Sequence, residues 1–108
     1  MRVIAIILAT LLSAVTLGSQ ESQPTTQRGT GLLTVCRDTT EFSRGVCMGY
    51  ILGVADTSKG VCVPPGVNVR QIVDLCVQYL EQHPATRQEF SYQLILRALH
   101  EAWSCPAQ

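Results

Sequence analysis

The stretch from Phe42 to Ser58, FSRGVCMGYILGVADTS, predicts a long helix with two different faces. Its apolar residues recur at the spacing of one helical face, which is typical of an amphipathic helix that buries a stripe. These residues are Phe42, Val46, Cys47, Tyr50, Ile51 and Val54. Gly45, Gly49 and Gly53 fall on roughly the opposite side of the same helix. We therefore expect a central helix, covered on both sides, around which the chain is organised.

The glycine row itself predicts close packing. A glycine inside a helix costs about 1 kcal/mol relative to alanine, so a row of glycines indicates a compensating contact with another backbone. Gly45, Gly49 and Gly53 can meet another helix of the same chain, or the same helix of a second molecule, which would form a homodimer. Both alternatives stay open. Arg44 and Asp56 bracket a run that is too short for a membrane span.

The N-terminal residues have the features of a secretory signal peptide. A positive start at Arg2 is followed by an apolar run and then by small residues up to Gly18. We expect residues 1–18 to be a signal peptide cleaved after Gly18, and an uncleaved membrane anchor is the alternative. Residues 19–30 are polar and predict a flexible lead-in, and residues 31–108 form the expected helical domain.

The charge balance excludes several classes of partner. The chain has eight basic and eight acidic residues, and only one lysine, Lys59. Nucleic acids and anionic membranes both require clustered basic side chains. We therefore expect no nucleic-acid partner and, after signal cleavage, no stable membrane insertion.

The remaining patterns complete an all-α domain. Residues 31–37 form a short apolar segment, residues 69–82 a helix with an Asn68/Gln71 capping box, and residues 84–103 a final helix. Residues 61–67 carry two prolines and a glycine, which predict a stiff loop. No alternating apolar pattern indicates a strand. The expected fold is a small disulfide-stapled bundle of about four helices.

Five cysteines behind an export signal predict a disulfide framework with one cysteine left over. Cys36 and Cys47 lie on either side of a turn and would face each other in a helical hairpin. Cys62 and Cys105 would then form the second pair. Cys76 falls on the apolar stripe of its helix, where a free cysteine acts as a small hydrophobe. Four cysteines allow three connectivities, so the other pairings remain open.

The residues favour binding over chemistry. No cysteine pair or histidine has the spacing of zinc ligands, so we expect no metal and no cofactor. His83 is more easily explained as a helix-boundary residue, and His100 as a residue on a solvated helix face, than as partners of a catalytic cysteine. Asp56 has no second carboxylate near it in the sequence. Aromatic residues at helical spacing belong to a core or interface first. We therefore do not expect an enzyme.

Several segments together resemble the Rap/Tai family of type VI secretion immunity proteins. They are LLTVC at 32–36, VCMGYILGVAD at 46–56, CVPPGV at 62–67, IVDLCVQYLEQHP at 72–84 and LILRALHEAWSCP at 94–106. The resemblance covers about Leu32 to Pro106. Cys76 departs from it by standing at an ordinarily apolar position, and Trp103-Ser104-Cys105 replaces the usual Phe-Pro-Cys ending.

The resemblance implies a small, helical, periplasmic protein, often dimeric, that binds a secreted peptidoglycan amidase and blocks its active-site groove. A stiff loop loses little entropy on binding, which makes the end of the central helix and the proline loop our candidate contact surface. Its residues are Asp56, Lys59, Val63, Pro64, Pro65 and Gly66. The alternative is that this loop is a plain connector between helices.

A second function fits the same sequence. Domains of this type can serve as an orphan periplasmic interaction or envelope-stress protein with no catalytic activity and no toxin partner. An amidase gene beside this one would favour immunity, and its absence would favour the orphan module. A helical enzyme is a weaker third hypothesis, because no catalytic residues are paired.

Overall fold

The computed structural model describes residues 25–107, which fold into four α-helices and one short 3-10 helix. The elements are α1 (Gly29–Arg37), α2 (Glu41–Thr57), α3 (Val69–Gln82), η1 (Pro84–Thr86) and α4 (Ser91–Trp103). Within these residues only two isolated β-bridges occur and no strand. The prediction of a small all-α bundle is confirmed.

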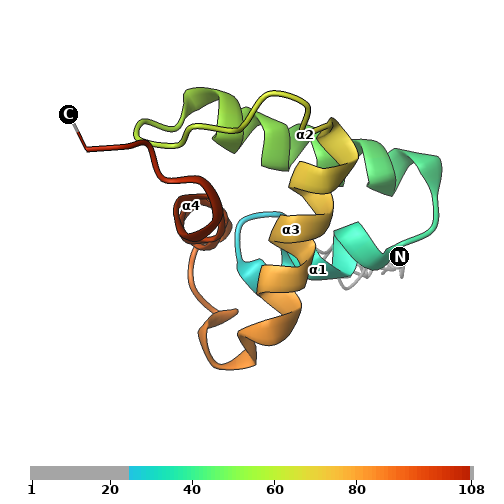
Figure 1. The fold of residues 1–108 in the computed structure, drawn as a ribbon. Helices are drawn as coiled ribbons and strands as arrows, with labels where there is room; N and C mark the ends of the chain where they lie inside the picture. Colours follow the sequence, from blue (N-terminus) through green and yellow to red (C-terminus); the bar gives the residue numbers. More distant parts are fainter. Residues whose placement is uncertain (1–24, 108) are drawn as a thin grey trace, which may run out of the picture.

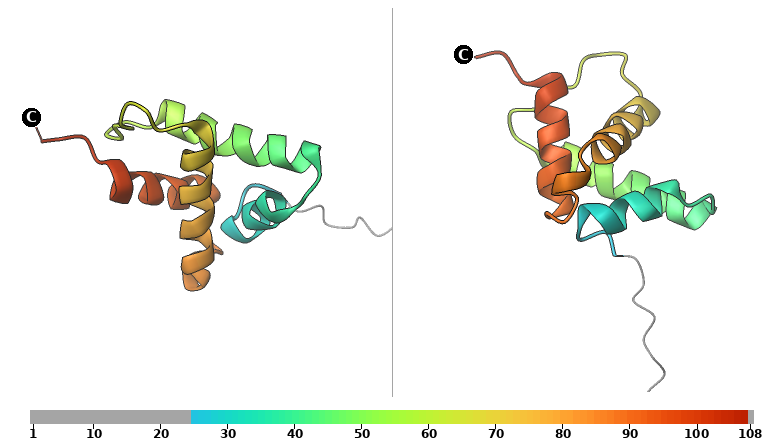
Figure 2. Two further views of the ribbon diagram at one scale, coloured as in Figure 1. Left: turned by 45° about the vertical axis from the view of Figure 1, so that its right-hand side comes forward. Right: turned by 90° about the horizontal axis from the view of Figure 1, so that it is seen from below.

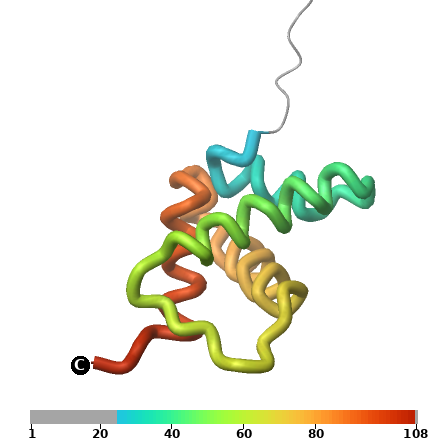
Figure 3. The backbone as a smooth tube through the Cα atoms, turned by 90° about the horizontal axis from the view of Figure 1, so that it is seen from above, coloured from blue at the N-terminus to red at the C-terminus, as the bar shows by residue number. Residues whose placement is uncertain are grey.

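The helices pack around α2, which contacts each of the other three. α1 and α2 form an antiparallel hairpin, α3 crosses α2, and α4 packs on both (Figure 1). The two turned views show that α1, α3 and α4 lie on one side of α2 (Figure 2). The segment between α2 and α3 swings outward and runs beside the C-terminal end of the chain (Figure 3).

Local capping explains where α2 and α3 begin. The Thr40 hydroxyl accepts a hydrogen bond from Ser43 N at 3.2 Å, and Asp38 accepts one from the Ser43 hydroxyl at 2.6 Å. This hydrogen bond from Ser43 is the main cause that lowers the pKa of Asp38. At α3, Asn68 and Gln71 exchange hydrogen bonds of 2.8 and 2.9 Å, so the predicted capping box is confirmed.

One apolar core joins all four helices. α2 contributes its Cys47 and Ile51, which lie on the side facing the other helices. The remaining core residues come from α1, α3 and α4: Leu32, Leu33, Val35, Ile72, Cys76, Tyr79, Leu80, Leu94, Ile95, Ala98 and Leu99. Their burial provides the hydrophobic stabilisation of the fold.

The opposite side of α2 is open, which corrects the expectation of a helix covered on both sides. Among residues 25–107, no atom lies within 4 Å of a Cβ built at Gly45, Gly49 or Gly53, so these glycines do not pack closely on another of the described helices. Phe42, expected in the buried stripe, is 81% exposed. It precedes Gly45 by three residues and Gly49 by seven, so it shares the glycine face.

The segment that precedes α1 is more structured than predicted. α1 begins at Gly29, two residues before the expected domain boundary. Gly29 N donates to Glu89 O at 3.1 Å, and Ser91 N donates to Gln27 O at 2.9 Å. The described part of the predicted lead-in, residues 25–30, therefore belongs to the domain. The predicted signal peptide and residues 19–24 lie outside the described residues.

The same backbone pairing divides the predicted final helix. Pro84 opens only the short η1, and α4 begins at Ser91 instead of continuing from Pro84. Phe90 is extended, with φ −63° and ψ 133°, and forms an antiparallel bridge with Arg28. The apolar periodicity of residues 84–103 could not predict this break, because the bridge joins Phe90 to a residue far away in the sequence.

Two disulfides close the bundle. Cys36–Cys47 joins α1 to α2, and Cys62–Cys105 joins the loop after α2 to the end of the chain. The Cα atoms are 5.0 and 4.9 Å apart, within the usual range for disulfides. This is the pairing that the hairpin argument favours. Cys76 is free and fully buried in the core.

Candidate partner-binding surface

The candidate contact residues lie at the end of α2 and along the segment that follows it. We call this the loop surface, and define it as Asp56, Lys59, Val63, Pro64, Pro65 and Gly66. All of these residues are exposed except Val63, which is half-buried. Five of the six residues that the sequence analysis proposed are therefore accessible to a partner.

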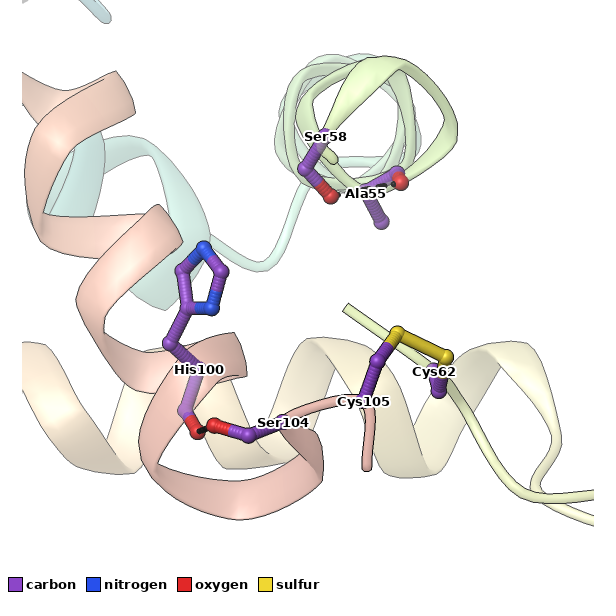
Figure 4. The surroundings of a disulfide bond; sticks show 6 residues. All are labelled: Ala55, Ser58, Cys62, His100, Ser104 and Cys105. Atoms are coloured by element: carbon purple, nitrogen blue, oxygen red, sulfur yellow. Dashed lines mark hydrogen bonds between the residues drawn. A yellow bond between two sulfur atoms is a disulfide. The ribbon is translucent and has the colours of Figure 1, made fainter. Parts of the chain in front are cut away.

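The C-terminal end of the chain holds the middle of this loop in place. Cys62 N donates to Trp103 O at 2.8 Å, and Cys105 N donates to Gly60 O at 3.0 Å. The Cys62–Cys105 disulfide adds a covalent link beside these two hydrogen bonds (Figure 4). The loop is therefore anchored by both backbone and sulfur at the same place.

The two ends of the loop are also fixed. At its start, the Ser58 hydroxyl donates to Ala55 O at 2.9 Å (Figure 4). Near its end, Val67 N donates to Pro64 O at 3.3 Å, and Gly66 between them has φ +88°. Proline followed by glycine with positive φ is the pattern of a type II turn. This turn leads directly into the α3 capping box.

The side chains of the loop divide between the core and solvent. Val61, Val63 and Val67 are half-buried and pack against the core. Lys59, Pro64 and Pro65 are exposed. The valines therefore hold the loop against the bundle while the prolines and the lysine remain accessible to another molecule.

His100 supports the loop from α4. Gly60 has φ +79°, and a Cβ built on it would lie 3.1 Å from His100 Cε1. The His100 carbonyl accepts a hydrogen bond from the Ser104 hydroxyl, next to the disulfide (Figure 4). His100 was expected on a solvated helix face; it is exposed, and it also lies against the loop.

Cys76 and His83 do not belong to the loop surface. Burial raises the pKa of the Cys76 thiol to about 12, so little nucleophilic thiolate forms near neutral pH. His83 stacks on Tyr79 with ring centroids 3.9 Å apart, and its Nδ1 lies 2.7 Å from Tyr79 O. Within residues 25–107 no three acidic, histidine or cysteine side chains gather as a metal site.

A second surface feature was missed by the sequence analysis. A hollow of about 430 Å³ lies beside the Cys36–Cys47 disulfide and is lined by Arg44, Met48, Arg70, Val73 and Asp74 together with both cysteines. Its walls come from three helices. No local spacing indicates such a hollow, because the helices that form it must first fold together.

The fold and the loop surface define a class: a small all-α domain, stapled by two disulfides, that presents a stiff exposed loop. A family model described as Rap1a immunity proteins matches residues 28–105, which is most of the chain. The chain therefore belongs to the Rap1a immunity protein family, and the resemblance seen in the sequence is confirmed. The comparisons with curated proteins and with solved structures gave no match.

Membership of this family has direct consequences. An immunity protein acts by binding a toxin protein, so the family points to a non-catalytic inhibitor with a protein partner. The two disulfides are compatible with an exported protein. None of the helices within residues 25–107 has the length and apolar character needed to cross a membrane.

Proposed function

We propose that this protein is a periplasmic immunity protein that binds a type VI secreted peptidoglycan amidase and inhibits it by occupying its active-site groove. The observation that carries the proposal is the loop surface of a Rap1a family member: it is exposed, yet it is anchored by the Cys62–Cys105 disulfide and by backbone hydrogen bonds. Inhibition then requires binding alone and no catalytic group.

The anchoring favours tight binding. A flexible loop must be ordered when it binds, and each immobilised, rotamer-rich side chain costs roughly 0.5–1.5 kcal/mol. The proline pair and the disulfide order this loop before the toxin arrives. The exposed face therefore enters a groove with little further loss of conformational entropy.

Export to the periplasm is part of the proposal. It rests on the signal-like residues 1–18 and on disulfides that need an oxidising compartment. A peptidoglycan amidase acts in that same compartment, so its inhibitor must reach it folded and oxidised.

We also propose that the open face of α2 forms a homodimer. No atom of residues 25–107 lies within 4 Å of a Cβ built at Gly45, Gly49 or Gly53, so the described bundle leaves this face free for a second molecule. Phe42, 81% exposed, supplies apolar area at one end of it. Two such faces can approach closely because glycine has no side chain.

The first experiment is a pull-down with the purified protein, both disulfides formed, from periplasmic extract and from a lysate that contains type VI effectors. Mass spectrometry identifies what is retained. We expect a peptidoglycan amidase whose activity falls when the protein is added. Recovery of other envelope proteins and no amidase would instead support the orphan interaction module.

Variants then test whether the loop surface makes the contact. Lys59→Glu and Pro64→Glu change exposed side chains and leave the Pro65-Gly66 turn intact. Gln88→Glu is the matched control, because it adds the same side chain at an exposed position between η1 and α4, at the opposite end of the bundle (Figure 1). We expect the loop variants to weaken inhibition at least tenfold, about 1.4 kcal/mol, and the control to have no effect. Equal inhibition by all three would place the contact elsewhere.

A further inference from the structure

We propose that the hollow beside the Cys36–Cys47 disulfide is a second docking site, which receives a segment of a protein partner that carries a carboxylate next to an aliphatic side chain. We call this hollow the arginine groove and define it by Arg44, Met48, Arg70, Val73, Asp74 and the Cys36–Cys47 disulfide. It shares no residue with the loop surface, and the inference does not require that the partner be an amidase.

The shape of the groove suits side chains of a partner. Its volume of about 430 Å³ is at the lower end of the range of ligand pockets. α2 provides one wall through Arg44 and Met48, and α3 provides the other through Arg70, Val73 and Asp74. A short extended or helical segment can place two or three side chains in such a space.

The apolar part of the groove is accessible and not fully used by the core. Met48 is 41% exposed, although most large apolar residues of the described chain are buried or half-buried. Val73 is half-buried, and the disulfide itself presents sulfur, which is polarizable and weakly hydrated. An aliphatic side chain from a partner would cover these atoms.

The charges of the groove select the sign of the partner. Arg44 and Arg70 are exposed, and neither forms a salt bridge within residues 25–107, whereas Arg37 pairs with Glu81 and Arg97 with Glu89. Asp74 is the single carboxylate that lines the groove. Two guanidinium groups against one carboxylate leave a net positive charge, which is complementary to an acidic side chain.

The apolar atoms of the groove limit what kind of anion fits. A phosphate is repelled more strongly by Asp74 but also attracted more strongly by Arg44 and Arg70, so the sign of the charge does not discriminate against it. An inorganic anion would, however, leave Met48 and Val73 uncovered. A carboxylate on an apolar segment satisfies both parts of the groove, so the geometry favours a peptide over a free phosphate.

The groove adjoins the loop surface at the start of α3. The loop ends at the Asn68 cap, the next residue is Val69, which is 44% exposed, and Arg70 follows it. One partner large enough to cover the loop surface can therefore also place a side chain in the arginine groove.

The test uses the purified protein, with both disulfides formed, and two blocked peptides, acetyl-Leu-Glu-Leu-amide and acetyl-Leu-Gln-Leu-amide. Amide NMR spectra are recorded as each peptide is titrated. We expect saturable shifts at Met48 and Val73 with the glutamate peptide, and several-fold weaker binding of the glutamine peptide. Because the partner toxin is absent, this result is independent of the amidase proposal.

Charge variants give effects of opposite sign. Arg44→Gln and Arg70→Gln should each weaken binding of the glutamate peptide, and Asp74→Asn should tighten it. The loss for each arginine should be only about threefold, because an ion pair between the peptide carboxylate and an exposed arginine is weak in water. Arg97→Gln removes an arginine outside the groove and should change nothing. Circular dichroism checks that each variant is folded.

Three results would overturn the inference. One is the absence of saturable shifts in the groove with the glutamate peptide. Another is equal binding of the two peptides, which would remove the role of the charge. The third is displacement of the glutamate peptide by an equal concentration of inorganic phosphate, which would make the groove a general anion site.

Discussion

Two glycines of the loop are required by backbone conformation. Gly60 has φ +79° and Gly66 has φ +88°, in the left-handed region that side chains disfavour. Gly66 has open space around it, whereas Gly60 lies against His100. A side chain at Gly66 would therefore cost only the left-handed backbone conformation, whereas a side chain at Gly60 would also meet His100.

We predict that Gly66→Ala lowers the free energy of unfolding by about 1–2 kcal/mol, the cost of a left-handed residue with a side chain. Gly60→Ala should lose at least as much, because its new Cβ would also lie 3.1 Å from His100 Cε1. Urea unfolding measures both. A neutral result at Gly66 would show that the turn relaxes into another conformation.

Cys76 is the free cysteine, and its environment determines its reactivity. Its side chain is fully buried in the core, and burial raises the pKa of its thiol from 9.0 to about 12. The folded protein therefore holds this proton more tightly than the unfolded chain. The resulting stabilisation is complete below pH 9 and is lost as pH rises towards about 12.

We predict that iodoacetamide does not label Cys76 in the native protein at pH 8 and labels it fully in urea, since only the exposed thiolate reacts. Above pH 9 the free energy of unfolding should fall more steeply for the natural protein than for Cys76→Ala, because the variant has no thiol to ionise at this position. Parallel curves for the two proteins, or native labelling, would show that the thiol reaches solvent.

At the scale of the helix, α2 has one packed side and one open side. Cys47 and Ile51 face the core, while Phe42 and the three glycines face solvent. The glycines therefore gain no close contact from the packing of residues 25–107. Their helix carries the conformational cost of glycine without a compensating contact inside the bundle.

Gly49→Ala should accordingly raise the free energy of unfolding by about 1 kcal/mol when the protein is monomeric. Gly29→Ala is the matched control and should destabilise, because its Cβ would lie 2.9 Å from Arg87 O and clash with Leu94. If the open face forms the proposed homodimer, Gly49→Leu should halve the mass in solution and leave the monomer folded. An unchanged mass would exclude this face as the dimer interface.

On the scale of the whole molecule, the two disulfides constrain different parts of the chain. Cys36–Cys47 closes a hairpin with a sequence separation of 11 residues, and Cys62–Cys105 closes a separation of 43 residues. The longer bridge restricts the unfolded chain more, and it is also the one that anchors the loop surface.

We predict that replacing Cys62 and Cys105 by alanine lowers the free energy of unfolding by about 4 kcal/mol, and replacing Cys36 and Cys47 by about 3 kcal/mol, in the chain-entropy description. Binding to the partner should fall more in the first variant, because only there is the loop released, whereas the second variant removes only the sulfur atoms that line the arginine groove. Equal loss of binding in both would show that stability, and not loop anchoring, controls recognition.

Patterns within short segments were sufficient for the helices, the Asn68/Gln71 capping box and the stiff proline loop. These features depend on neighbours within one or two helical turns, so the sequence contains them directly. The exposure of most residues from Asp56 to Gly66 was predictable in the same way, since turn residues and polar helix ends have local signatures, and their contact with a partner stays a prediction.

Only the tertiary structure decided which sides of these elements are covered. Periodicity shows that α2 has two faces, but the positions of α1, α3 and α4 leave the glycine face and Phe42 open. The pairing of residues 27–30 with residues 87–91 starts α4 late, and three helices together form the arginine groove. Each of these depends on residues far apart in the chain, whose contacts are set by the packing of the whole core and not by the preference of any one segment.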